Sequence, residues 1–218
     1  MLDTVLDAVF PPRCGGCRAR HTWLCEACRL SIRAAPLTAC RRCRRLVSLD
    51  PCPMCEAGEG PESMIALARL EGPLREAIHR LKYGDRPQLS SHVVNATLVA
   101  RRLAPGTLVP VPLHPARRRR RGYNQAELLV RELSVRAGAP WLDALERVGG
   151  HRSQVGRGGS ARRESLRGAF RWRLTGPPPP AVVIVDDVLT TGTTLLECAL
   201  VARSAGVRRV ETLAVALG

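Results

Sequence analysis

The sequence has few aromatic side chains, and those few are scattered along it. Aromatic residues make up 3% of the 218 residues. They are Phe10, Trp23, Tyr83, Tyr123, Trp141, Phe170 and Trp172. A protein that stacks many bases of a single strand needs aromatic side chains interleaved with a basic groove. The scarcity therefore argues against a broad single-strand stacking platform.

Long apolar runs and a secretory signal are also missing. No stretch approaches the roughly 18 apolar residues of a membrane-spanning helix. The N-terminus, MLDTVLDAVF, holds two aspartates and lacks the basic start of a signal peptide. Its Leu2, Val5, Leu6 and Val9 have helical spacing and predict a short docking helix. We therefore expect a cytoplasmic, reducing location, where cysteines bind metal more often than they form disulfides.

Lysine is nearly absent, whereas positive charge is abundant. The formal net charge is +15, and Lys82 is the one lysine among 34 basic residues. Such an excess favours anionic partners, which include phosphates, nucleic acid and acidic lipid. A chain of 218 residues suits one ordinary domain with a second, small one.

Eight of the nine cysteines form four C-x-x-C pairs near the N-terminus: Cys14/Cys17, Cys25/Cys28, Cys40/Cys43 and Cys52/Cys55. This segment is too short and too poor in aliphatic residues to fold on an apolar core. Structural zinc supplies roughly 10–16 kcal/mol of apparent binding free energy, which replaces the missing core. Two pairs make one tetrahedral site, so the sequence predicts two structural zinc ions.

Two points about the cysteines stay open at this stage. A redox role is the alternative to zinc, but a redox site needs a single C-x-x-C pair, and this segment has four. The spacing does not settle which pairs share an ion. Adjacent pairing, 14/17 with 25/28 and 40/43 with 52/55, leaves the shorter loops and is our prediction. Cys198 lies in an apolar helical pattern and is predicted to be buried.

The composition changes at EAGEGPES (56–63), which is typical of a linker. We expect an N-terminal helix and double zinc ribbon over 1–57 and an α/β domain over 63–218. Residues 149–168 are predicted to be a mobile loop. Strands are expected at 64–70, 107–113, 141–147, 182–185 and 210–216, and helices at 73–82, 88–103, 124–137 and 193–205. Alternating strands and helices predict a mostly parallel sheet flanked by helices.

The stretch VVIVDDVLTTGTTL (182–195) carries the clearest functional pattern. In parallel sheets, ligands bind where a strand ends and the next helix begins. Loop amides, the helix dipole and hydroxyls there can wrap a phosphate, from Thr190, Thr191, Gly192, Thr193 and Thr194. Asp186 and Asp187 would repel that phosphate, but their oxygens can accept hydrogen bonds from a ribose diol. The pattern predicts a ribose 5-phosphate ligand.

Other readings of the chain fit less well. A P-loop requires Gly-Lys-Ser/Thr, which this stretch lacks. VGRGGS (155–160) follows no strand and is not continued by the third glycine of the G-x-G-x-x-G pattern, so it is not a dinucleotide fingerprint. A phosphoacceptor receiver has its paired aspartates near its N-terminus and a lysine downstream. A plain structural turn is the remaining alternative.

Several segments together carry a resemblance to a known family. They are the eight-cysteine segment, LKYGDRP (81–87), PVPLHPARRRRRGYNQAELL (110–129), SQ…RRESLRGAF (153–170) and VVIVDDVLTTGTTL. The last resembles the PRPP-binding signature of type I phosphoribosyltransferases. The whole chain resembles the ComF family, whose members include ComFC and GntX. The resemblance implies a type I phosphoribosyltransferase fold behind a double zinc ribbon, PRPP with Mg²⁺ as ligand, and a link to DNA uptake in natural transformation.

The resemblance also assigns roles to residues. It implies that Asp186 and Asp187 hold the ribose diol or its metal and that residues 190–194 hold the 5-phosphate. The PVPLHP turn is similar to the pyrophosphate loop of these enzymes. Arg117, Arg121 and Arg162 are then candidates to neutralise the departing pyrophosphate. Arg118 and Arg120 fall outside the family's arginine pattern and are read as added charge.

Two functions from different classes follow from these observations. One is a phosphoribosyltransferase with an unidentified acceptor and no evident general base. The other is a binding protein that handles single-stranded DNA, contacts membrane-associated DNA-uptake proteins, and keeps the PRPP site as a regulatory or vestigial one. The aspartate–threonine stretch favours the first, whereas the charge and the zinc ribbons favour the second.

Overall fold

The computed structural model describes residues 11–57, 60–98, 104–148 and 168–218. The helix predicted at the N-terminus and nearly all of the loop predicted at 149–168 lie outside these ranges. Among the described residues, no helix combines the length and the apolar character needed to cross a membrane.

The core of the molecule is a six-stranded sheet with the order β1-β2-β3-β8-β7-β4. Its strands are β1 (Thr38–Ala39), β2 (Leu46–Val47), β3 (Ser63–Arg69), β4 (Thr107–Pro110), β7 (Ala181–Leu189) and β8 (Arg209–Leu217). All neighbouring strands in it pair in parallel except β1 and β2. A separate antiparallel hairpin joins β5 (Leu145–Arg147) to β6 (Phe170–Trp172).

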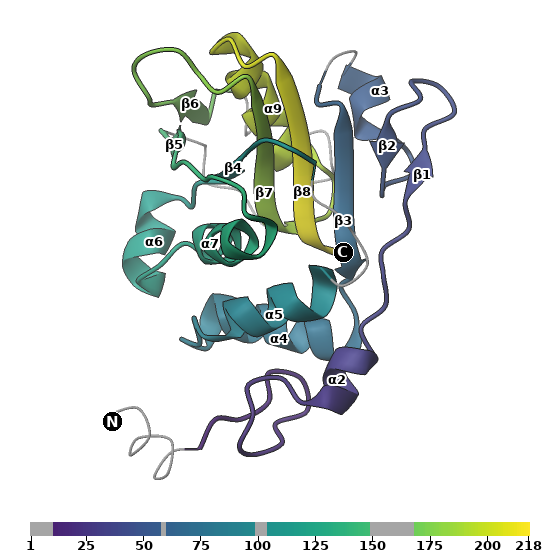
Figure 1. Ribbon diagram of the computed structural model, residues 1–218, viewed down its shortest axis with the longest axis vertical. Coiled ribbons are helices and arrows are strands. Elements are labelled where there is room, and N and C mark those ends of the chain that lie inside the picture. Colours follow the sequence, from purple (N-terminus) through teal and green to yellow (C-terminus); the bar gives the residue numbers. More distant parts are fainter. Residues whose placement is uncertain (1–10, 58–59, 99–103, 149–167) are drawn as a thin grey trace.

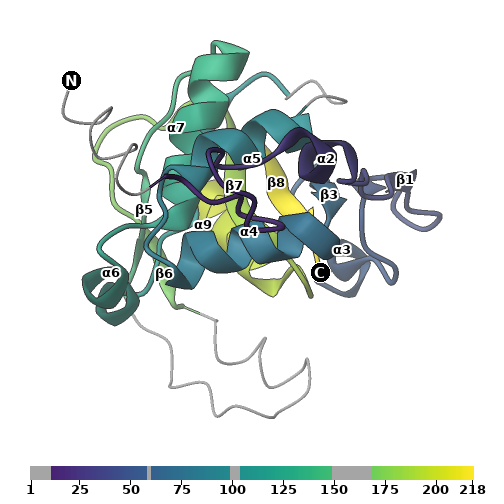
Figure 2. The same ribbon diagram turned by 90° about the horizontal axis from the view of Figure 1, so that it is seen from below.

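Helices cover both faces of this sheet (Figures 1 and 2). One apolar cluster joins Val183 and Val185 of β7 to α4 (Gly72–Tyr83), α5 (Leu89–Thr97) and α7 (Gln125–Ala137). The other joins Val182 and Ile184 to α9 (Thr193–Ser204), α3 (Pro53–Ala57) and the β5–β6 hairpin. Side chains alternate between the two faces of a strand, so the apolar run Val182–Val185 of β7 reflects the cover on both faces.

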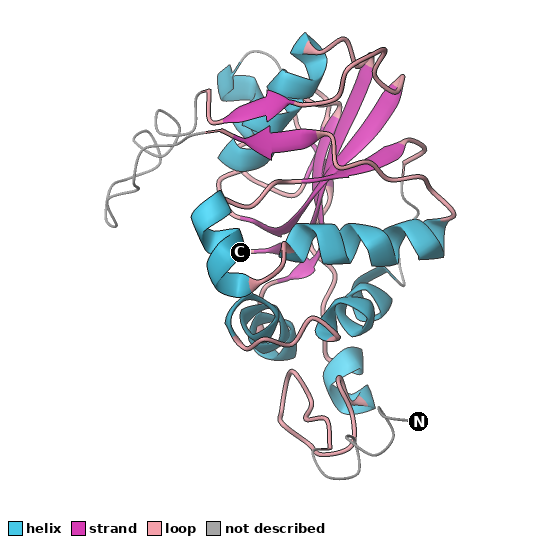
Figure 3. Cartoon of the chain, turned by 90° about the vertical axis from the view of Figure 1, so that its left-hand side faces the viewer, coloured by secondary structure: helices cyan, strands magenta, loops and turns pink. Residues whose placement is uncertain are grey.

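The cysteine-rich segment is divided between two places. Its first part, with α2 (Glu26–Leu30), lies at one end of the molecule beyond α4 and α5 (Figures 1 and 3). Its second part supplies β1 and β2, which extend the main sheet beside β3, and α3. The boundary that we predict between residues 57 and 63 therefore falls within one continuous sheet, and the two-domain division stays a prediction.

The predicted fold class is confirmed: the sheet is mostly parallel, helices flank it, and the cysteine-rich segment precedes most of it. Two local differences matter for function. Strand β7 continues to Leu189, so the aspartate pair lies within the strand and not after it. The arginine run forms a helix of its own, α6 (Pro115–Arg121). Pro115 suits a first helical turn, and the His114 side chain accepts a hydrogen bond from the Ala116 N–H.

Candidate functional site

Strand pairing brings the predicted site together at one edge of the sheet. Pro110, the last residue of β4, is in register with Val185 of β7. The next N–H, that of Val111, donates to the Val185 carbonyl at 2.9 Å. Because the two strands run in parallel, the turn after β4 lies beside the aspartate pair that follows Val185.

Alternation along β7 sends the two carboxylates to opposite faces. Asp186 continues the series of Val182 and Ile184, and Asp187 that of Val183 and Val185. The predicted acids are thus neighbours in the chain but face different elements of the fold. Asp186 faces the side of α9 and the β5–β6 hairpin, whereas Asp187 faces the side of α4.

Asp187 is buried and has a cationic partner. Only 4% of the residue is exposed, and its Oδ1 lies 2.9 Å from Nζ of Lys82 near the end of α4. The other oxygen, Oδ2, is buried and has no hydrogen-bond partner among the described residues. A buried acceptor without a partner costs free energy, so Asp187 keeps one oxygen free for a donor. The sequence analysis did not assign a role to Lys82, although it is the chain's one lysine.

Asp186 is set apart by its electrostatics. Burial, and then the charge of Asp187, raise the pKa of its carboxyl to about 7. Two influences act to lower the pKa of Asp186. The N–H of Asp187 donates to Oδ1 of Asp186 at 2.8 Å, and Lys82 and Arg147 contribute positive charge. The two acids therefore have different environments: one is held in an ion pair, and the other changes protonation near neutral pH.

The loop after β7 turns sharply into α9, a helix of 12 residues. Gly192 precedes the helix with φ +76°, and a Cβ on it would lie 2.5 Å from Sδ of Met64 and 3.0 Å from Cγ of Pro53. Glycine is thus required here by both conformation and space. Thr190 and Thr191 are exposed, and the hydroxyl of Thr191 lies 3.0 Å from that of the buried Thr193. A small hollow lined by Asp186 and residues 188–195 lies at the start of the helix, where the helix dipole favours negative charge.

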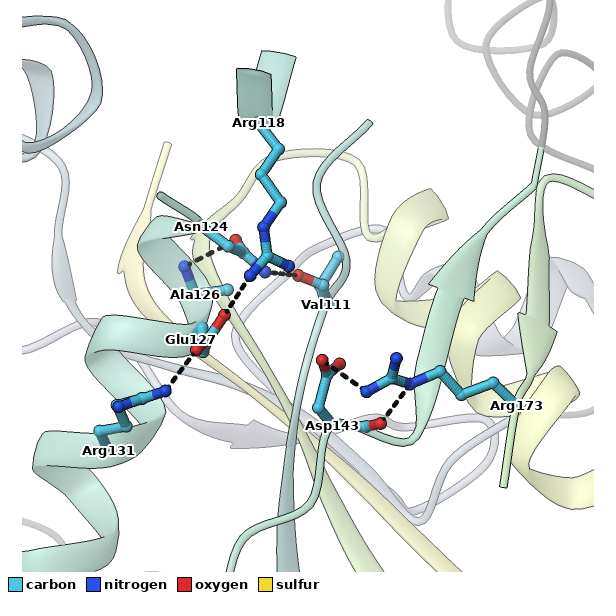
Figure 4. A network of polar contacts seen from close by, with 8 residues as sticks. All are labelled: Val111, Arg118, Asn124, Ala126, Glu127, Arg131, Asp143 and Arg173. Atoms are coloured by element: carbon cyan, nitrogen blue, oxygen red, sulfur yellow. Dashed lines mark hydrogen bonds and ion pairs between the residues drawn. The ribbon is translucent and has the colours of Figure 1, made fainter. Parts of the chain in front are cut away.

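A cavity of about 300 Å³ lies between the turn after β4, α6 and the β5–β6 hairpin. Its lining residues are Pro112, Leu113, Pro115, Arg118, Arg119, Asn124, Asp143, Leu145, Glu146, Arg147 and Arg173. Figure 4 shows how part of this wall is held: Arg118 pairs with Glu127 at 3.2 Å and Arg173 with Asp143 at 2.7 Å. Asn124 donates to the Val111 carbonyl at 3.0 Å, which ties the turn to the start of α7.

Two of the cavity's guanidinium groups, those of Arg119 and Arg147, form no ion pair with described residues. The Nε of Arg147 is buried without a hydrogen-bond partner. Burial, and then the charge of Arg117, lower the pKa of Arg147, whereas Asp186 raises it. Asp186 and Arg147 each favour the charged form of the other. Arg147 was not among the residues predicted from the sequence. The one feature that could have indicated it is a basic residue within a half-buried strand.

Two of the arginines chosen from the sequence, Arg117 and Arg121, lie on α6 but outside the described cavity lining. Arg117 is exposed and is not part of the described cavity lining. Arg121 donates to Oε1 of Gln125 and lies 5.2 Å from the ring centre of Tyr83. Arg162 lies outside the described residues. A role for these three in binding pyrophosphate stays a prediction.

The eight N-terminal cysteines form two groups of four, and the adjacent pairing is confirmed. Cys14, Cys17, Cys25 and Cys28 make one group, and Cys40, Cys43, Cys52 and Cys55 the other, with all sulfurs of a group within 4.8 Å of one another. Closest separations of 3.5 to 3.9 Å match the roughly 3.8 Å between corners of a tetrahedron around zinc. N–H groups of Cys43 and Arg42 also lower the pKa of Cys40 to about 6. Each group has the donors and spacing to hold one zinc ion.

Both cysteine-rich parts contact elements that border the candidate site. Arg80 of α4 donates to the carbonyls of Cys14, Gly15 and Gly16 in the first knuckle. In the second group, helix α3 carries Pro53, which lies against the position of Gly192. The metal-binding segment therefore contacts α4 on one face of the sheet and the threonine loop on the other.

Comparison with known proteins identifies the family. "Competence protein F" of Haemophilus influenzae is 30% identical over 220 residues, covering 93% of this chain and 95% of that protein. "DNA utilization protein YhgH" of Escherichia coli K12 is 31% identical over 203 residues, covering 88% of each. The chain belongs to the ComF family.

Two further comparisons add little to the ComF assignment. No protein-family model matches the chain. A solved structure of "the allosteric regulatory enzyme of purine biosynthesis" superposes with a TM-score of 0.35 and 16% identity. That match covers 59% of this chain, which spans a quarter of the other (25%).

The cysteine geometry predicts that the ComF protein contains about two zinc ions per chain. Replacing Cys14 with serine should remove about one of them and unfold the first knuckle, because four thiolates hold each ion. Elemental analysis and circular dichroism would measure this. Cys198→Ala is the matched control, since Cys198 is buried on α9 and belongs to neither group of four, and it should keep both ions. A folded protein without metal would contradict the assignment.

The raised pKa of Asp186 predicts a pH-dependent stability. Between about pH 4 and pH 7 the folded state keeps a proton on Asp186 that the unfolded state has lost. The free energy of unfolding should therefore fall as pH rises through this window, by up to about 1.4 kcal/mol per pH unit from this group. Urea unfolding from pH 4 to pH 8 would measure it. Asp186→Asn should remove this contribution, and equal pH profiles for variant and wild type would contradict the prediction.

Proposed function

We propose that this ComF protein binds PRPP with Mg²⁺ at the carboxyl edge of β7 and works on DNA taken up by the cell. The observation that carries the proposal is the order of groups at this edge. A buried parallel strand carries two acids two residues before its end, and a threonine-glycine loop then leads directly into a helix of 12 residues. Acids that suit ribose hydroxyls and a loop that suits a phosphate thus stand at one place.

The 5-phosphate belongs at the threonine loop in this proposal. The first N–H groups of α9 lack partners within the helix, and its dipole favours an anion. Around these N–H groups, Thr190 and Thr191 are exposed and Thr194 is half-buried. Thr193 is buried, and its hydroxyl pairs with that of Thr191. Gly192 lets the backbone approach the ligand closely.

The ribose belongs beside β7. Ionised Asp186 can accept hydrogen bonds from ribose hydroxyls, and the free Oδ2 of Asp187 can accept one more. Carboxylate oxygens are also the ligands that Mg²⁺ prefers, so Asp186 fits a role in holding the ion. When bound, Mg²⁺ would reduce the negative charge of the pyrophosphate group.

The pyrophosphate belongs in the arginine-lined cavity. Arg119 and Arg147 have no described ion pair and can therefore bind phosphate oxygens without breaking one. In a transfer reaction, an acceptor would bond to C1 of the ribose while the bond from C1 to pyrophosphate breaks. The two guanidinium groups would then take up the negative charge that develops on the leaving group. Arg117, Arg121 and Arg162 remain further candidates for this role.

The DNA part of the proposal is supported by the printed names of relatives, one a competence protein and one a DNA utilization protein. It is also supported by the net charge of +15 and by α6, whose Arg117, Arg118, Arg119 and Arg120 are exposed. The second candidate function is therefore single-stranded DNA binding, with PRPP as a regulatory ligand. A cytoplasmic site of action, next to membrane-associated DNA-uptake proteins, belongs to the same proposal.

PRPP should bind to the wild-type protein in the presence of Mg²⁺, as measured by isothermal titration calorimetry. Replacing both Asp186 and Asp187 with asparagine should abolish binding, because it removes the charged acceptors of the ribose hydroxyls. Glu62→Gln, a change of an acid at the opposite end of the neighbouring strands, is the control. Unaltered PRPP binding by the double variant would overturn the proposal. Release of pyrophosphate with one of a panel of acceptors would then distinguish an enzyme from a binding protein.

The exposed arginines of α6 make a separate prediction for DNA. Each arginine that neutralises a phosphate contributes about 0.7 to the slope of log K against log salt concentration for a single strand. Replacing Arg118 and Arg120 with glutamine should reduce the magnitude of that slope by up to about 1.4. Replacing Arg120 alone should leave PRPP binding intact, because Arg120 is not part of the described cavity lining. Fluorescence anisotropy with a labelled oligonucleotide at several salt concentrations would measure it. An unchanged slope would show that these two side chains are ordinary solvated charge.

A further inference from the structure

Lys82 stands out in both sequence and structure. It is the one lysine among 34 basic residues, and it forms the ion pair with Asp187 at 2.9 Å. Its side chain is 22% exposed and that of Asp187 is 5% exposed, so the pair is largely shielded from water. Partly buried ion pairs are screened much less than surface pairs.

The geometry of the pair leaves one acceptor of Asp187 without a partner. Lys82 occupies Oδ1 of Asp187, whereas Oδ2 has no described hydrogen-bond partner. A carboxylate free to rotate would present its two oxygens in turn. With one oxygen fixed by the ammonium group, the other keeps a single direction at the edge of the sheet.

Helix α4 is itself held in place on the side away from Asp187. Arg80, two residues before Lys82, points away from the sheet and donates to three carbonyls of the first cysteine knuckle. Two residues on a helix are separated by about 200°, so the two side chains lie on opposite faces. The buried Leu74, Ala77 and Leu81 of α4 add apolar contacts to the core.

We propose that Lys82 is a positioning residue of the ligand site, which acts by fixing Asp187 with its free oxygen directed at a ribose hydroxyl. The proposal rests on the proposed PRPP site and adds a residue to it. Lys82 acts through Asp187 and does not itself contact the ligand. A lysine suits the position because a compact ammonium group on a flexible stem reaches one oxygen, whereas a guanidinium fork tends to engage both.

The test is a double-mutant cycle on PRPP binding, measured by calorimetry with Mg²⁺. Lys82→Met removes the charge and keeps the apolar stem, so PRPP affinity should fall at least about tenfold. Lys82→Arg should recover part of the loss. If Lys82 acts through Asp187, the variant Lys82→Met with Asp187→Asn should bind no more weakly than Asp187→Asn alone. Arg75→Met, an exposed change on the same helix, should bind as wild type.

The melting temperature of each variant shows separately how the substitutions affect folding. Lys82→Met leaves a buried anion unpaired and should lower the melting temperature, whereas adding Asp187→Asn removes that anion and should restore it. Restored stability without restored PRPP binding is a result that a purely structural role for Lys82 does not produce. If Lys82→Met does not fold, Lys82→Gln, which keeps a donor without the charge, takes its place in the cycle.

The outcomes separate this inference from the function on which it rests. Wild-type affinity in Lys82→Met, with weakened binding in Asp187→Asn, would overturn the role of Lys82 alone. Losses from the two changes that simply add would also overturn it, because each residue would then act independently. Wild-type PRPP binding in both Asp187→Asn and Asp186→Asn would overturn the proposed PRPP site itself.

Discussion

The candidate site depends on the position of β7 in the sheet. This strand pairs in parallel with β4 on one side and β8 on the other, and both its faces are covered. Parallel pairing brings the turn after β4 beside the end of β7, and the alternation of side chains sends Asp186 and Asp187 to opposite faces. The neighbours of each acid follow from that geometry.

The charges around the two acids have unequal consequences. Lys82 gives Asp187 a fixed partner on the α4 side. Asp186 is half-buried on the other side, where Arg147 partly offsets the repulsion from Asp187. Two chemically identical residues thus acquire different properties from their surroundings.

The cysteine groups are integrated with this site and not attached at a distance. The first group is joined to α4 through Arg80, and α4 carries Lys82. The second packs into the same apolar cluster as α9, where Pro53 lies against Gly192. Structural metal in either group would therefore stabilise an element that lines the ligand site.

The amino-acid sequence alone determined the fold class, the four C-x-x-C pairs and the motif at the end of β7, since each depends on local spacing or on alternation of residue types. Which pairs form one group of four was settled by the structure, because it depends on how the segment folds back on itself. The tertiary structure decided the ion pair of Lys82 with Asp187, the position of Arg147 and the raised pKa of Asp186. These arise from side chains that meet across different elements, and no periodicity in the chain records them. Which arginines line the cavity was also a tertiary matter, because α6 presents successive side chains in different directions about 100° apart.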